Sequence, residues 1–358
     1  MAISAIDTVS LAFRHTKQQL LQPFRFGQWV RLAIVGLLAG ELGSGGSNLR
    51  SSLGKGGGSG PLPPGFPHID PAILGAIIAL LIVIGLVFFL VMTYISSVMR
   101  FILFDSVLSK YCRIGEGWSR RQGPGFKLFL WHLGFGLIVL CGVVVLVGLP
   151  VAFAYFNGWF SAPRAHMQGL ILGGLAVFCA GMLLVVTVVV IHVFTKDFVV
   201  PQMALEGIGP IEAWSRLWPM LQAEKGDYAV YAIVKVVLAI VAAIIVGIAT
   251  AIIGVIVALP AIGMMLAAVV AGKTAGLTWN VFTITGAVVA GCILLGIFLF
   301  LVAMISVPVM VFFPAYSIYF FAPRYRALGL ALYPAPPQTV TSTAPQGFTP
   351  PPAPLPAG

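Results

Sequence analysis

Long uncharged apolar runs limit most strongly how this chain can fold. The stretch PAILGAIIALLIVIGLVFFL, residues 71–90, contains no charged or polar side chain. A helix of about 20 such residues is long enough to cross a lipid bilayer. Only 8% of the chain is charged, against about 25% in soluble domains, and its mean hydropathy is +1.04. We therefore expect an all-α, polytopic membrane protein.

Six runs are apolar and long enough to be membrane-spanning helices. They cover about residues 27–44, 71–108, 125–156, 167–205, 227–259 and 280–321. Several are longer than a crossing requires, so their helices are expected to tilt or to project beyond the membrane. The segment 260–272 is apolar but too short to cross. It is expected to be re-entrant, interfacial or an extension of the fifth run that is kinked at Pro260.

Two segments lack the composition of a packed core. Residues 43–71 are rich in Gly, Ser and Pro and predict a flexible external loop. The GKGGGSG stretch in this loop does not fit a phosphate-binding loop, because Leu49 and Gly56 stand where that motif needs Gly and Ser or Thr. Residues 333–358 are dominated by Pro and predict a disordered cytoplasmic tail.

The positive charges gather on one side of the predicted spans. The formal net charge is +10, and of the 20 Lys and Arg only Arg50, Lys55, Arg164 and Lys273 fall on the other side. The side rich in Lys and Arg is normally cytoplasmic, so both termini are expected in the cytoplasm, as six crossings require. No compact basic domain remains to bind nucleic acid. The charge is therefore attributed to topology and to anionic lipid headgroups.

A five-residue phrase occurs twice and indicates an internal repeat. EGWSR ends at Arg120 and EAWSR ends at Arg216, and the apolar runs before them end in similar phrases, FILF and FVVP. A weaker third copy starts near residue 11. We expect one transmembrane domain, residues 1–325, built from three two-span units at about 1–110, 111–207 and 208–325.

The repeated phrase has the composition of an interfacial helix. Its residues are Glu116, Trp118 and Arg120 in one copy and Glu212, Trp214 and Arg216 in the other. Trp is favoured at the level of the lipid headgroups, and Arg can extend to lipid phosphate. The Glu and Arg residues are four positions apart, which suits an ion pair on a helix. Each unit is therefore expected to begin with a cytoplasmic interfacial helix.

Among the ionisable residues within or beside the predicted spans, five are the candidates for chemistry: Asp105, His132, His192, Asp197 and Lys235. Ionisable residues in a membrane are candidates for a functional polar site. The alternative is that the two carboxylates and the lysine reach the interface or pair with neighbours, and that the histidines bond to carbonyls. Neither HExxH nor G-x-S-x-G occurs, and no two cysteines have CxxC spacing. No catalytic motif, metal site or cofactor is therefore expected.

The stretch DFVVPQMALEGIGPIEAWSRLWPML, followed by GDYAVYAIVKVVLAIV, resembles a recurring bacterial membrane family. This family is the membrane domain associated with glycerophosphodiester phosphodiesterases and with related multi-span proteins. The markers are Pro201, Glu212, Ala213, Trp214 and Gly226, and the resemblance covers residues 195–325 best. It implies a helical membrane fold. The enzymes also carry a soluble catalytic domain rich in Glu, Asp and His, and only the Pro-rich tail follows the sixth run here, so the activity is not carried over.

These observations favour a non-catalytic, multi-pass protein of the bacterial cytoplasmic (inner) membrane. We expect an accessory, scaffold or lipid-associated role, with the lipid bilayer and a membrane protein as partners. A transporter or permease for a small or amphiphilic substrate is the alternative, because the chain repeats and because Gly and Pro interrupt its spans. A membrane-embedded lipid enzyme is the third hypothesis.

Overall fold

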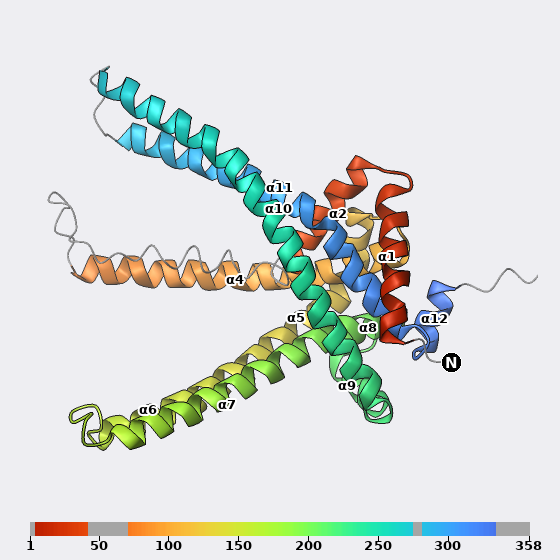
Figure 1. Ribbon diagram of the computed structural model, residues 1–358, viewed down its shortest axis with the longest axis horizontal. Coiled ribbons are helices and arrows are strands. Elements are labelled where there is room, and N and C mark those ends of the chain that lie inside the picture. The colour runs from red at the N-terminus through yellow and green to blue at the C-terminus, as the bar shows by residue number, and fades with distance from the viewer. Residues whose placement is uncertain (1–3, 42–70, 275–280, 334–358) are drawn as a thin grey trace, which may run out of the picture.

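The computed structural model describes residues 4–41, 71–274 and 281–333, and every regular element among them is helical. The helices form a body from which arms project on one side (Figure 1). The body contains α1 (Ala5–Leu21), α2 (Phe26–Leu38), α8 (Val200–Glu206), α9 (Pro210–Ala223) and α12 (Arg326–Leu332), with the inner ends of the longer helices. This arrangement agrees with the predicted all-α class.

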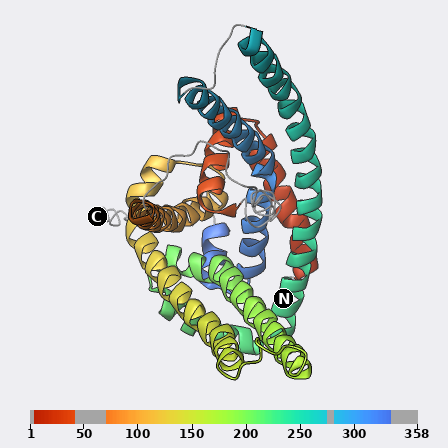
Figure 2. The same cartoon turned by 90° about the vertical axis from the view of Figure 1, so that its left-hand side faces the viewer.

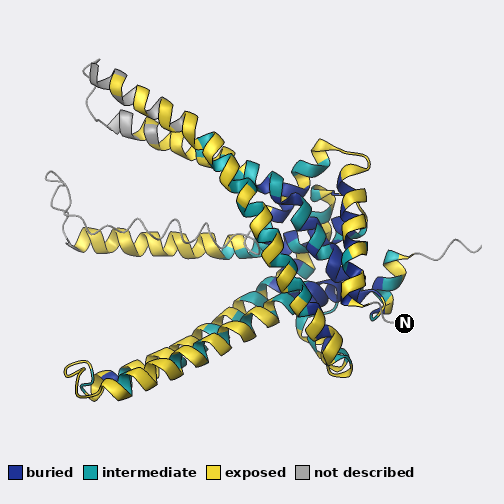
Figure 3. Ribbon diagram, in the orientation of Figure 1, coloured by how far each residue is buried: buried dark blue, intermediate teal, exposed yellow. Residues whose placement is uncertain are grey.

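Three arms are built from the longer helices. α4 (Pro71–Leu108) forms the first arm alone. The second is a hairpin of α5 (Ile114–Val143), η2 (Val144–Gly148) and α6 (Leu149–Phe156) with α7 (Met167–Phe194), and the third pairs α10 (Lys225–Thr274) with α11 (Val281–Phe321). The outer parts of the arms are exposed, and the buried residues gather in the body (Figure 3). Such apolar surfaces are stable in lipid and unfavourable in water.

Five helical stretches have the length and composition to cross a membrane. They are Ala72–Leu108, Ile114–Phe156, Met167–Glu206, Lys225–Pro260 and Val288–Phe321. These match five of the six predicted runs, so a multi-pass membrane protein is supported. The sixth crossing is not confirmed within the described residues.

The first predicted span corresponds to α2, which is part of the body. Its 13 residues measure about 20 Å at 1.5 Å per residue, less than the hydrocarbon thickness of about 30 Å. Leu32 and Val35 are completely buried, and the Trp29 indole donates to the Met304 carbonyl at 2.9 Å. The apolar face of α2 therefore packs against α11.

The segment 260–272 is part of α10. This helix continues from Lys225 to Thr274 with Pro260 inside it. Of the three predicted arrangements, the structure shows the extension of the fifth run.

Both ends of the described chain lie on the body side (Figure 1). Ser4 caps α1 and Tyr333 follows α12. Glu41 is buried in the body, whereas Pro71 begins α4 at the outer end of its arm. Glu41 and Pro71, the residues on either side of the undescribed segment, therefore lie at opposite ends of the first arm. The predicted external loop and the predicted tail after Tyr333 also lie outside the described residues.

Two π-helical turns interrupt the long helices, and each stands just before a proline. η2 ends at Gly148, two residues before Pro150, and η3 (Thr195–Val199) ends two residues before Pro201. Proline lacks the N–H that would bond four residues back, and its ring collides with that carbonyl. A wider turn relieves the collision, and such turns are frequent at functional sites. Pro201, predicted as a structural marker, therefore shapes the turn that carries Lys196 and Asp197.

The inner ends of α4 and α7–η3 each pack against a helix that follows in the chain: α4 packs against α5, and η3 packs against α9. The inner end of α11, the last long helix, packs against α1, the first helix. Figure 2 shows α4 end-on with α5 passing beside it. Aromatic rings fill the body where these pairs meet; the ring centre of Phe198 lies 5.1 Å from that of Phe321 and 5.2 Å from that of Tyr231. All three rings are buried.

The contact between α4 and α5 depends on a glycine. A Cβ atom on Gly125 would lie 2.5 Å from Cγ2 of Val98 and 3.1 Å from the Val98 Cα atom. Because the second atom belongs to the backbone, rotation of the valine side chain alone does not relieve the contact. The helices can therefore approach this closely only without a side chain at position 125.

We expect Gly125→Ala to destabilise the folded protein by about 1–3 kcal/mol, the usual cost of an overpacked core. Gly123→Ala is the matched control, because a Cβ atom there meets nothing within 4 Å and the gain in helix propensity is similar. Denaturant unfolding of the two full-length variants in the same detergent measures the difference. Equal stabilities would contradict the close approach of α4 and α5.

His15 fastens α1 to the body through both ring nitrogens. Nε2 lies 3.0 Å from the Val107 carbonyl oxygen, and Nδ1 lies 3.1 Å from the Tyr319 hydroxyl. The bonds fit a neutral ring that donates from Nε2 and accepts at Nδ1. Burial, together with the charge of Lys110, lowers the pKa of His15 below its ordinary value.

The lowered pKa makes stability depend on pH. Below about pH 6.5 the unfolded chain binds a proton at His15, whereas folded His15 stays neutral until the pH falls further. The contribution of His15 to the free energy of unfolding is therefore fully present above about pH 6.5 and is lost as the pH falls. We expect the melting temperature of the wild type to fall more between pH 7.5 and pH 5.5 than that of His15→Asn. Parallel curves would show that His15 does not contribute.

Candidate functional site

The two Trp-Ser-Arg phrases occupy different helical settings. EAWSR belongs to the separate helix α9, whereas EGWSR forms the first turns of α5, which continues into the second arm. Arg216 pairs with Glu212 at 2.6 Å, as predicted. Glu116 pairs with Arg113 at 3.0 Å, so the predicted pair with Arg120 is wrong. Arg113 precedes the helix by one residue and reaches Glu116 across the first turn.

Both tryptophans of the phrases are half-buried against the body. The Trp118 ring lies edge-on to Tyr94 of α4, with centres 6.2 Å apart. The Trp214 indole donates to the Thr195 hydroxyl of η3 at 3.2 Å. Neither lines the small cavity described below. Both tryptophans therefore join helices to one another.

The large apolar side chains of α9 divide into two groups. Trp214, Leu217 and Leu221 pack against the body, whereas Ile211 and Trp218 are 74% and 59% exposed.

Four of the five predicted polar residues converge where the arms meet the body. His132, His192, Asp197 and Lys235 join three residues that the prediction did not include, Glu41, Arg100 and Lys196. We call these seven residues the charged cluster. It gathers residues from α4, α5, α7, η3 and α10, with Glu41 following α2.

Two buried ion pairs hold the charged cluster together. Lys196 pairs with Glu41, and Lys235 pairs with Asp197. The Tyr231 hydroxyl also donates to Asp197 at 2.9 Å. The carboxylates of Glu41 and Asp197 are only 3% and 2% exposed. Burial alone would raise the pKa of Glu41, but Lys196, with Arg100 and Lys235, outweighs this effect and lowers it.

Arg100 and the two histidines form the other half of the charged cluster. The Nε of Arg100 donates to the Ala39 carbonyl at 3.3 Å, and one terminal nitrogen lies 3.4 Å from Nε2 of His192. The His132 and His192 rings have centres 5.9 Å apart. The Ser97 hydroxyl lies 3.5 Å from Nδ1 of His132. The inner ends of the first and second arms are thus connected by polar contacts.

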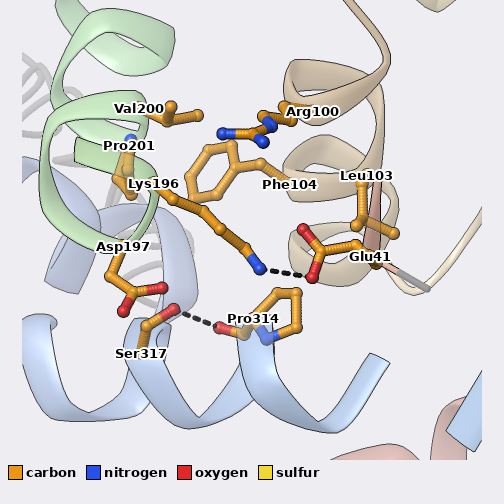
Figure 4. Close-up of a pocket in the computed structure, with 10 residues that line it drawn as sticks. All are labelled: Glu41, Arg100, Leu103, Phe104, Lys196, Asp197, Val200, Pro201, Pro314 and Ser317. Carbon is orange, nitrogen blue, oxygen red and sulfur yellow. Dashed lines mark hydrogen bonds and ion pairs between the residues drawn. The ribbon is translucent and has the colours of Figure 1, made fainter. Parts of the chain in front are cut away.

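The charged cluster encloses a small cavity. Glu41, Arg100, Lys196 and Asp197 line it together with Pro201 and other residues, and the Lys196 side chain crosses it to reach Glu41 (Figure 4). Its volume is about 30 Å³. A water molecule needs about 10–15 Å³ on this measure. The cavity therefore has room for a small ion or about two waters and not for an organic substrate.

The arms are long enough to cross the membrane beyond the charged cluster. Residues 133–156 and 167–191 contain no Asp, Glu, Lys, Arg or His, and each stretch measures about 36 Å as a helix. The hydrocarbon layer is about 30 Å thick. The charged cluster therefore fits at the body-side edge of that layer and does not need to lie at its centre.

Asp105 lies apart from the charged cluster. It accepts two bonds of 2.7 Å from the guanidinium of Arg121, which also donates to the Ala204 carbonyl at 2.7 Å. These contacts join α4, α5 and α8. A groove of about 630 Å³ adjoins them, lined in part by Asp105, Glu116, Arg120 and Arg121. Of the two predicted interpretations for Asp105, the structure shows pairing with a neighbour, because its carboxylate is held by Arg121 away from the histidines.

Sequence reasoning missed Glu41, Arg100 and Lys196, although all three gave a signal. Glu41 lies within the first predicted run, Arg100 within the second and Lys196 within the fourth. A charged residue in an apolar run requires a partner. Applied to every run, this rule would have included all three residues.

The apolar arms, with the charged cluster at their inner ends, place this chain in the class of multi-pass helical membrane proteins. The chain belongs to a family described as "Family of unknown function (DUF7544)", whose model matches residues 3–331. Comparisons with curated proteins and with solved structures find no match.

Proposed function

We propose that this chain is a non-catalytic, lipid-associated scaffold in the bacterial cytoplasmic membrane. The observation that carries the proposal is the first arm. Residues 72–89 of α4 are exposed on every face, over a length of about 27 Å. Among the described residues, no other helix covers this apolar surface. It is therefore suited to lipid or to the spans of a partner protein.

The membrane position follows from the same surfaces. With the hydrocarbon layer on the arms, the body lies on the side that the excess of Lys and Arg assigns to the cytoplasm. The described chain ends lie on this side, which supports cytoplasmic termini. The packing of α4 with α5, of η3 with α9 and of α11 with α1 supports three repeated units. The resemblance to the phosphodiesterase-associated membrane domain stays a prediction, and we extend from it only the helical membrane fold.

Cysteine labelling in intact cells tests the membrane position. In a variant without native cysteines, Ser161→Cys places a thiol in the turn between α6 and α7, at the outer end of the second arm, and Lys225→Cys places one at the body end of α10. A membrane-impermeant maleimide should label position 161 in intact cells and position 225 only after lysis. The reverse pattern would invert the proposed topology.

Native mass spectrometry of the purified full-length protein tests the scaffold role. The exposed first arm predicts that phospholipid or a membrane protein stays bound after mild detergent extraction. A lipid-free monomer that catalyses transport in liposomes would refute the proposal.

A transporter is the second candidate, favoured by one observation. The Lys235–Asp197 ion pair connects α10 of the third arm with η3 at the inner end of the second arm, so that breaking and re-forming it could accompany an arm movement. Transport would require the 30 Å³ cavity to widen toward the outer side. A disulfide between the second and third arms should then abolish uptake into liposomes, whereas the scaffold proposal expects no uptake with or without it.

A further inference from the structure

We propose that Arg100, His132 and His192 bind the phosphate group of a membrane lipid at the foot of the space between the first and second arms. This inference rests on the proposed lipid association and adds a site and a ligand chemistry to it.

Arg100 is the one cation of the charged cluster that has no carboxylate partner among the described residues. Lys196 and Lys235 are each paired with a carboxylate. Arg100 instead contacts the Ala39 carbonyl and His192, and its remaining terminal nitrogen is buried without a hydrogen-bond partner. A buried donor on a charged group is costly when it has no partner. A bound anion would satisfy it.

A second buried nitrogen without a partner lies on the neighbouring helix. Nε2 of His132 has none, while Nδ1 of the same ring faces Ser97. His192 is exposed beside Arg100, so the site can be reached from the space between the arms. Each neutral imidazole donates from one ring nitrogen. The group therefore presents a forked guanidinium flanked by one N–H of each imidazole, a donor set that suits phosphate oxygens.

The place of these residues favours a lipid as the source of the phosphate. The charged cluster fits at the body-side edge of the hydrocarbon layer, which is the level of lipid headgroups. The exposed apolar side chains of residues 72–89 and 133–149 extend from there along the two arms. Acyl chains would lie against these surfaces while the phosphate sits between α4, α5 and α7. Free phosphate would use the donors but not the arms.

The test titrates the full-length protein in detergent with dioleoyl phosphatidylglycerol and, separately, with dioleoylglycerol, and measures binding by native mass spectrometry. The two lipids share their acyl chains and differ in the phosphate headgroup. The wild type should bind phosphatidylglycerol at least about ten-fold more tightly, the effect expected from one or two charge-assisted hydrogen bonds. Arg100→Gln should lose this preference, and Arg14→Gln, which removes an exposed arginine from α1, should keep it.

The outcomes separate this site from the proposed function. If Arg100→Gln binds phosphatidylglycerol as the wild type does, the site is wrong and lipid association stands. If the wild type binds neither lipid, the proposed function fails. If 50 mM inorganic phosphate displaces phosphatidylglycerol from the wild type, the ligand is free phosphate and the lipid assignment is overturned. If Arg100→Gln does not fold, the wild type alone tests the site. A preference for phosphatidylglycerol over dioleoylglycerol supports the site, and equal binding of the two lipids rejects it.

Discussion

Lys235→Met is expected to destabilise the folded protein by about 3–5 kcal/mol, the usual cost of removing one partner from a buried ion pair. Lys235 is 12% exposed and Asp197 is 2% exposed. Without the lysine, Asp197 keeps the bond from the Tyr231 hydroxyl but has no paired cation. A buried carboxylate in that state is penalised by the loss of its hydration.

Two further variants make this prediction specific. Lys225→Met removes an exposed lysine ten residues earlier in the same helix and should change the stability by no more than about 0.5 kcal/mol. The double variant Lys235→Met with Asp197→Leu removes both charges of this ion pair, so most of the loss should be recovered. Thermal and denaturant unfolding of the full-length proteins in one detergent measure all three. A double variant less stable than Lys235→Met would show that the charges themselves are needed.

The membrane arms could be predicted from the sequence because their signal is local. An uncharged apolar run longer than 20 residues is typical of a helix that crosses a membrane. Five of the six predicted runs form long helices. The crossing predicted for the segment that contains α2 is not confirmed, and there is a physical reason. Hydropathy measures the preference to leave water and does not distinguish lipid from the interior of a protein. Leu32 and Val35 leave water by packing into the body, which no window of sequence reveals.

The charged cluster depends on contacts between residues far apart in the chain. Glu41 and Lys196 are separated by 155 positions, and Arg100 and His192 by 92. The sequence marks such residues as unusual in apolar surroundings without naming their partners. Four of the residues that it marked, His132, His192, Asp197 and Lys235, lie together, and Asp197 pairs with Lys235 as the alternative interpretation expects. Asp105 looked equivalent but is held by an arginine sixteen residues away.

The repeated phrase directed attention to Arg120, whereas the neighbouring arginine makes the buried contacts. Arg121 is 8% exposed, donates to both oxygens of Asp105 and to the Ala204 carbonyl, and so joins three helices. Arg120 is exposed at the groove. The repeated phrase ends at the exposed Arg120, while the residue that fixes α5 to α4 and α8 lies one position outside the phrase.

Arg121→Ala is therefore expected to reduce the free energy of unfolding by about 3 kcal/mol, since it removes three charge-assisted hydrogen bonds and leaves Asp105 without its cation. Arg120→Ala, one residue earlier, should change it by no more than about 0.5 kcal/mol. Because Asp105 is 29% exposed, water can reach it in Arg121→Ala, and the loss should be smaller than in Lys235→Met. Denaturant unfolding of both variants beside the wild type measures these differences. A larger loss in Arg120→Ala than in Arg121→Ala would restore the repeated phrase as the structural element and contradict the packing of α5 described above.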